Sequence, residues 1–183
     1  LPEHWLFALA NLQTMQGFLG KGNYGISRMN GGFSNRPAVG LMDGSGLGKR
    51  FCEDVAALLR RRDKVLEIYP YRSEGGAALL WTEEWNGKSS LRPDQLDPYF
   101  VEICRRIRLA ANEAGAVGAW TTPTSVARVK IVNGLTGDPW TPLDADAALT
   151  VSARGFDYKL VSDLLFRRLY HLPIAMDVKL RRE

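Results

Sequence analysis

The chain has 183 residues, a formal net charge of +4 and a pI near 9.2, with 45% hydrophobic and 24% charged residues. These values are typical of a soluble globular protein, and no apolar run approaches the ~18 residues of a membrane span. The chain holds two Cys and two His, none closely spaced, which excludes a zinc signature. The N-terminus also lacks the features of a signal peptide, so we expect a cytoplasmic protein without a membrane partner.

The N-terminal part of the chain begins with a predicted helix over Leu1–Gln16, where Pro2 and Glu3 suit a first helical turn. Its apolar residues leave little polar face, so we expect this helix to be buried. The glycine-rich stretch Met15–Arg50 follows and holds more than half of the 18 glycines. A second helix is predicted over Gly48–Lys64, with one apolar side and a basic, solvated remainder.

The middle of the chain carries a predicted strand over Ala77–Trp85 and then the clearest predicted helix, Pro93–Glu113, with apolar residues at helical spacing. Residues alternate over Ser125–Asn133 and predict an amphipathic strand. The exposed face of this strand is expected to carry two cations, Arg128 and Lys130.

The C-terminal part is predicted to contain a strand over Leu149–Ala153, a helix over Phe156–Tyr170 and a last strand over Ile174–Leu180. The mixture has no regular βαβ rhythm, which predicts an α+β fold of helices packed with a few antiparallel strands and a long glycine-rich loop. We expect residues 1–183 to form a single α+β domain. Because the chain starts within a helix and ends without a clear closing element, we also expect it to be a segment of a larger protein.

The glycine-rich stretch is the most distinctive feature of the sequence. Glycine lets a ligand approach the main chain closely. The stretch also carries several basic residues and a single acidic residue, Asp43. Two interpretations stay open: a surface loop with ordinary turn chemistry, or a loop that presents N–H groups and cations to an anion such as a nucleic acid.

Two segments of this stretch partly match nucleotide-binding motifs. Gly20, Gly22 and Gly25 match GxGxxG, but the dinucleotide fingerprint requires a preceding strand, and here a helix is predicted. The end of the stretch, Asp43–Arg50, departs from a phosphate-binding loop at its first glycine and at its magnesium-binding Ser/Thr position. A phosphate- or nucleotide-binding enzyme is therefore retained as an alternative function.

No catalytic constellation is visible in the sequence. His4 and His171 are interpreted as structural residues, and the Glu83-Glu84 pair has no evident partner group. The tryptophans, among them Trp120, are interpreted as packing or interface residues, which leaves a protein–protein scaffold as a further alternative. We expect no enzyme activity, no cofactor and no metal.

The run from Leu9 to Phe18, followed by GKGNYG at 20–25 and RMNGG at 28–32, resembles the glycine loop of CasA, the large subunit of the type I-E CRISPR Cascade complex. The downstream order is similar too, with a basic strand near Val126–Val132 and then Trp140-Thr141-Pro142. The resemblance covers nearly all of this chain but only a section of that family. The cysteine zinc knot of some members, the wedge element and the C-terminal helical bundle are not identifiable here.

The resemblance implies a non-catalytic subunit of an RNA-guided ribonucleoprotein in antiviral defence. Such a subunit recognises the protospacer-adjacent motif of target double-stranded DNA, supports unwinding, and recruits a helicase-nuclease. Its partners would be target DNA, the other Cascade subunits around the guide RNA, and that effector. The DNA-binding residues implied or inferred here are Gly20, Lys21, Gly22, Asn23, Tyr24, Gly25, Arg28, Asn30, Arg128 and Lys130, with Lys130 as the candidate motif reader.

Overall fold

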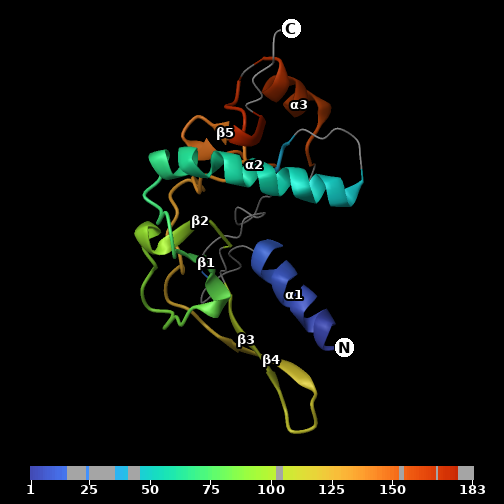
Figure 1. Ribbon diagram of the computed structural model, residues 1–183, viewed down its shortest axis with the longest axis vertical. Coiled ribbons are helices and arrows are strands. Elements are labelled where there is room, and N and C mark those ends of the chain that lie inside the picture. The colour runs from blue at the N-terminus through green and yellow to red at the C-terminus, as the bar shows by residue number, and fades with distance from the viewer. Residues whose placement is uncertain are drawn as a thin grey trace. The chain divides into compact units, whose positions relative to one another are not determined.

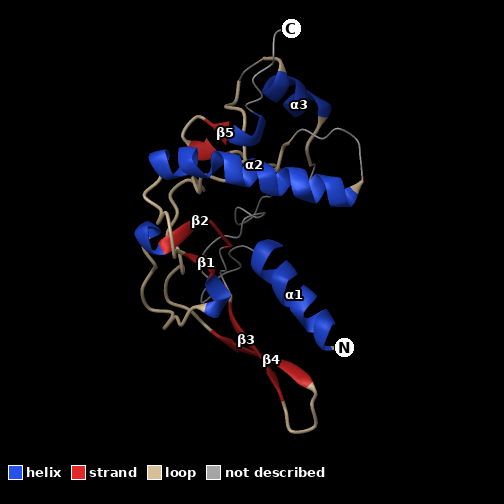
Figure 2. Ribbon diagram, in the orientation of Figure 1, coloured by secondary structure: helices blue, strands red, loops and turns tan. Residues whose placement is uncertain are grey.

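The computed structural model describes residues 1–15, 24, 36–40, 46–101, 105–152, 155–167 and 169–176 (Figure 1). Helices and short strands both occur, which confirms the α+β class (Figure 2). Backbone contacts divide the chain into two compact units, one of Leu1–Asn35 with Tyr71–Lys130 and one of Arg36–Pro70 with Ile131–Glu183. That the whole chain is one domain stays a prediction. The glycine-rich stretch lies largely outside the described residues.

The first unit contains one helix, two short 3-10 turns and four strands among its described residues. These elements are α1 (Pro2–Met15), β1 (Ala77–Leu79), η1 (Leu80–Thr82), η2 (Pro93–Gln95), β2 (Leu96–Val101), β3 (Arg106–Ala111) and β4 (Val117–Thr122). Strand β1 pairs in parallel with β2, whereas β3 and β4 form an antiparallel hairpin (Figure 1). The expectation of antiparallel strands therefore holds for the hairpin and not for β1 and β2.

The core of the first unit is built on β2, whose inward residues Leu96, Pro98 and Phe100 alternate with half-buried ones. Residue Gly76, just before β1, lies against the backbone of β2: a Cβ built there would be 2.5 Å from the amide nitrogen of Asp97. Glycine is therefore required for the close approach of these two segments.

The predicted helix Pro93–Glu113 is wrong, because η2, β2 and β3 occupy this region. Pro98 would stand in the helix interior, where it lacks the N–H and clashes with the preceding turn. The burial of every second residue in β2 shows that a period of two governs the segment. The apolar spacing that suggested a helix fits the strand equally well over this short range.

The predicted strand Ser125–Asn133 is also wrong: its one ladder contact with the described residues is an isolated bridge between Leu91 and Val129. The backbone of Ser125 and Arg128 bonds instead to Gly87 and Leu91, in the irregular segment that precedes η2. The strand predicted at Ala77–Trp85 is confirmed only for Ala77–Leu79, since η1 follows at once.

Helix α1 confirms the first predicted helix, but the expectation of burial is wrong. Gln13 is its one buried residue, and Nε2 of this side chain donates to the carbonyl of Arg105 at 3.4 Å. Leu6 and Phe7 are largely exposed. Apolar residues occur on all sides of this helix, and a neighbouring element can cover only some of those sides.

The second unit is organised on the long helix α2 (Leu47–Ile68), which confirms the predicted second helix and extends it by one turn. The other elements are β5 (Leu143–Asp144), β6 (Ala147–Ala148), α3 (Tyr158–Leu165) and η3 (Ile174–Met176). Helix α3 confirms the predicted C-terminal helix in shorter form, with Asp157 as its N-cap.

The two strands predicted near the C-terminus are not formed by the described residues. The strand predicted over Leu149–Ala153 is absent from the described residues of that range, and the nearest strand, β6, ends one residue earlier, at Ala148, where it pairs with β5. The segment expected to be the last strand starts with the 3-10 turn η3, and its remainder lies outside the described residues. The proline at 173 favours this turn, because it fixes φ and cannot donate to a ladder.

Candidate nucleic-acid interface

The structure describes three of the ten predicted DNA-binding residues. Tyr24 is half-buried, Lys130 is exposed, and Arg128 is buried. The other predicted residues lie outside the described part of the chain: Gly20, Lys21, Gly22, Asn23, Gly25, Arg28 and Asn30. The roles assigned to all ten stay predictions.

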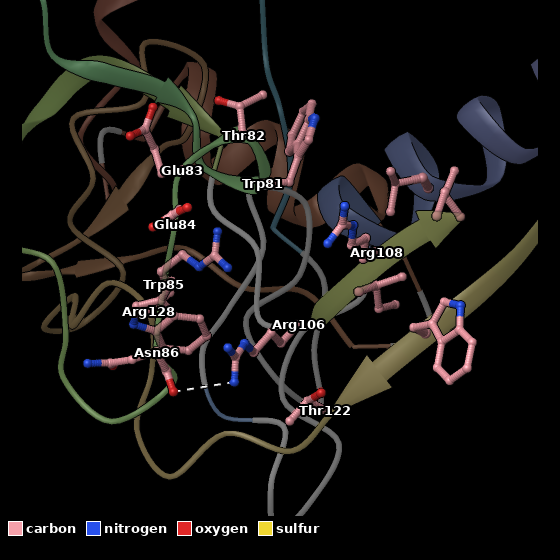
Figure 3. Close-up of a pocket in the computed structure, with 14 residues that line it drawn as sticks. Trp81, Thr82, Glu83, Glu84, Trp85, Asn86, Arg106, Arg108, Thr122 and Arg128 are labelled. Atoms are coloured by element: carbon pink, nitrogen blue, oxygen red, sulfur yellow. Dashed lines mark hydrogen bonds between the residues drawn. The ribbon is translucent and has the colours of Figure 1, made fainter. Parts of the chain in front are cut away.

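Arg128 is 4% exposed, so the expectation that it shares an exposed face with Lys130 is wrong. One terminal nitrogen of its guanidinium donates to the buried carbonyl of Leu80, and the group lies over the Trp85 ring, 4.5 Å from the centroid. The indole N–H of Trp85 in turn donates to the carbonyl of Ser89 at 2.6 Å. Arg128 therefore ties η1 to the segment that carries Lys130, and Figure 3 shows its side chain beside Trp85.

Burial lowers the pKa of Arg128 to about 10, and the positive charge of Arg106 acts in the same direction while Glu83 opposes it. The guanidinium is nevertheless charged at neutral pH, so its hydrogen bond to Leu80 is charge-assisted. The Nε atom of Arg128 is buried without a partner in the described structure. This arginine is thus a structural cation rather than a group open to an external phosphate.

The backbone of the segment before Lys130 is fixed at three points. The amide of Leu91 donates to the carbonyl of Arg128 at 2.7 Å, and the hydroxyl of Ser90 donates to the carbonyl of Ala127 at 2.8 Å. The amide and hydroxyl of Ser125 both donate to the carbonyl of Gly87 at 2.9 Å. An exposed lysine therefore extends from a backbone that is already ordered, which lowers the entropic cost of contacting a ligand.

A cleft of about 990 Å³ lies in the first unit, between η1 with the turn after it and the β3–β4 hairpin. Its wall includes three arginines, Arg106, Arg108 and Arg128, and two exposed carboxylates, Glu83 and Glu84 (Figure 3). The remaining lining residues are Leu9, Trp81, Thr82, Trp85, Asn86, Ile107, Leu109, Trp120 and Thr122. Because Arg128 is engaged internally, the guanidinium groups open to a ligand are those of Arg106 and Arg108, and such groups beside indole rings suit ligands that combine anionic groups with flat apolar ones.

Sequence reasoning missed the residues of the β3–β4 hairpin as a site. The sequence predicts Arg106 and Arg108 within a helix, and Trp120 as a packing or interface residue. A signal was present: Arg106 and Arg108 alternate with the apolar Ile107 and Leu109. That alternation, followed by the Asn112–Gly115 turn, is typical of a hairpin strand.

Within the described ranges, no group of three or more His, Cys, Asp or Glu is placed to hold a metal ion. No helix in that part of the chain is both long and apolar enough to cross a membrane. His171 belongs to an isolated bridge with Leu143, in the second unit. No family model, curated protein or solved structure matches this chain.

Proposed function

We propose that this chain is a section of a non-catalytic, DNA-binding large subunit of an RNA-guided CRISPR Cascade complex, acting in the cytoplasm. In this proposal the glycine-rich loop and Lys130 recognise the protospacer-adjacent motif of duplex DNA. The subunit then supports unwinding and recruits a helicase-nuclease. The proposal rests on the resemblance of residues 9–32 to the glycine loop of that family, and on the presentation of Lys130.

The observation that carries the proposal is the contrast between the two cations of the basic segment. Arg128 is buried beneath η1, whereas Lys130, two residues further on, is exposed on an anchored backbone. A side chain that reads a base pair needs a fixed backbone position, and its charged end must remain exposed to the DNA. This arrangement supports Lys130 as the reader and Arg128 as the residue that positions it.

The test is binding of a panel of short duplexes that vary the base pairs beside a guide-matched target, with the other complex subunits present. We expect a preference among duplexes of about 1–3 kcal/mol per unfavourable base pair. Lys130→Gln should reduce that preference and lower the steepness of the salt dependence by about 0.9 in log–log slope. Lys159→Gln on α3 removes the same charge from an exposed site in the second unit and serves as the matched control.

Replacement of Gly22 by a bulky residue probes the loop itself, and it should abolish the preference among duplexes. Equal binding to every duplex, unaltered by Lys130→Gln or by the change at Gly22, would refute the proposal. In that case a general phosphate contact or a scaffold role would remain. A nucleotide-using enzyme would instead show a thermal stabilisation by ATP or NAD.

A scaffold role is a second candidate, and exposed apolar side chains on α2 favour it. Phe51 and Leu59 are both more than two-thirds exposed on this helix. Large exposed apolar groups that recur along one helix are typical of protein–protein contacts. The role is compatible with a subunit of a larger assembly. A pull-down with the other subunits that is unaffected by Phe51→Ser would refute it.

A further inference from the structure

One face of the β3–β4 hairpin brings arginines and an exposed indole together. The antiparallel register pairs Arg106 with Thr122 and Arg108 with Trp120. Residues directly opposite each other in a ladder share a face, and so do alternate residues along a strand. The next pair on the same face, toward the hairpin turn, is Ala110 with Gly118. The position next to Trp120 on this face is therefore occupied by small residues.

The side chains of this face are available to a ligand. Trp120 is 73% exposed, an unusual state for the largest apolar side chain, and Arg108 is exposed as well. Nothing lies within 4 Å of a Cβ built at Gly118, so the space beside the indole is open. Arg106 is half-buried, and it donates one hydrogen bond to the carbonyl of Asn86 at 3.3 Å (Figure 3).

The charge of the hairpin face is positive. The part of the chain that the structure describes offers Arg108 no ion-pair partner, and none to Arg106. Glu83 and Glu84 belong to the opposite wall of the cleft, and Figure 3 shows both on the other side of Arg128 from Arg108. A polyanion that follows the hairpin is therefore attracted along β3 and repelled from the η1 side.

We propose that this face binds single-stranded nucleic acid, with a base stacked on Trp120 and backbone phosphates at Arg108 and Arg106. A flat indole accepts any base, and guanidinium groups accept phosphate oxygens in a planar, paired geometry. Bases inside a duplex have their faces covered by their neighbours, so Trp120 selects an unpaired strand. The site does not depend on the proposed reading of duplex DNA, which uses Lys130 and the glycine-rich loop.

The experiment measures binding of a fluorescent oligothymidylate of about 12 nucleotides, which lies within the usual site sizes. The protein used is the 183-residue chain. Trp120→Ala should weaken binding about 5- to 150-fold, the range expected for loss of one stacked base. Arg108→Gln should lower the log–log salt slope by about 0.7, the value for one phosphate contact of a single strand.

Two variants on α3 are matched controls, since both residues are exposed in the second unit. Tyr158→Ala removes an exposed aromatic side chain, and Lys159→Gln removes a positive charge. Both are expected to bind within about twofold of the unaltered chain, well below the loss of a stacked base. Trp120→Phe retains an aromatic face and should recover most of the affinity, which separates stacking from a folding defect.

The inference is overturned if Trp120→Ala binds as well as the unaltered chain, or if Tyr158→Ala loses as much affinity as Trp120→Ala. It is also overturned if a duplex of the same length competes as strongly as the single strand, or if only an acidic peptide binds the face. Lys130→Gln distinguishes the two proposals: it should weaken the preference among duplexes and leave oligothymidylate binding at the hairpin within twofold.

Discussion

Replacement of Arg128 tests whether a buried cation holds η1 to the segment before Lys130. Arg128→Ala removes a charge-assisted hydrogen bond to the carbonyl of Leu80 and a guanidinium stacked on Trp85. The carbonyl of Leu80, a residue with no exposed surface, then loses its charged donor and keeps the amide of Glu83, at 3.3 Å. A hydrogen bond to a charged group contributes about 1.5–3 kcal/mol, and a desolvated cation–π contact about 2 kcal/mol.

The lowered pKa of Arg128 shows that burial opposes its charged form, so part of this gain is already offset in the native protein. We therefore expect Arg128→Ala to lower the free energy of unfolding by about 2–4 kcal/mol. Arg128→Met keeps an apolar stem on Trp85 and carries no charge to desolvate, so it should cost about 1–2 kcal/mol.

The assay is urea unfolding followed by tryptophan emission, with Trp85 beneath the guanidinium as an internal probe. Arg108→Ala, at an exposed site on the same cleft, is the control and should change stability by no more than about 0.5 kcal/mol. If Arg128→Ala is as mild as this control, the guanidinium does not hold the two segments together. A larger loss for Arg128→Met than for Arg128→Ala would refute the role given to the stem.

Two further predictions concern backbone approach and alkaline pH. Gly76→Ala places a Cβ 2.5 Å from a backbone atom of β2 and should lower the urea midpoint markedly, whereas Gly118→Ala, with open space around it, should leave the midpoint nearly unchanged. Equal midpoints for the two variants would show that β1 and β2 are not closely paired. Burial raises the pKa of Tyr69 above its usual value of 10.0, so the fold is favoured below pH 10 and loses this stabilisation as pH rises through the raised value. Tyr69→Phe should accordingly lose less stability than the unaltered chain between about pH 9 and 11, measured by the urea midpoint, and an identical loss in both would contradict this assignment.

The helices were predictable from the sequence because their signals are local. Helix α2 has an apolar side and a basic side over many turns, and α3 has an Asp cap at its start. The burial of α1 was not predictable in the same way, because an apolar sequence does not reveal how many of its sides a neighbour covers. Its exposed Phe7 shows that composition alone is a poor guide to burial.

The strands and the cleft depended on signals that compete with one another. The apolar residues over Leu96–Ile107 recur at a helical spacing, but Pro98 alone excludes a regular helix there. The inward turn of Arg128 depends on Trp85 and Leu80, more than 40 residues earlier in the chain, and no local pattern encodes such a contact. The pairing of Arg108 with Trp120 likewise appears only when the hairpin register is known.

The contact between Arg128 and Leu80 spans 48 residues, and this span has a consequence for the nascent chain. A ribosome adds about 5–20 residues per second, so the Leu80 carbonyl, which can already accept from the Glu83 amide, is made roughly 2–10 s before its charged donor Arg128. During that interval Trp85 has no guanidinium above it, and β1 has only β2 for support once Val101 is complete. The contacts of Arg128 with Leu80 and Trp85 therefore form only after β1 and β2 have both been synthesised.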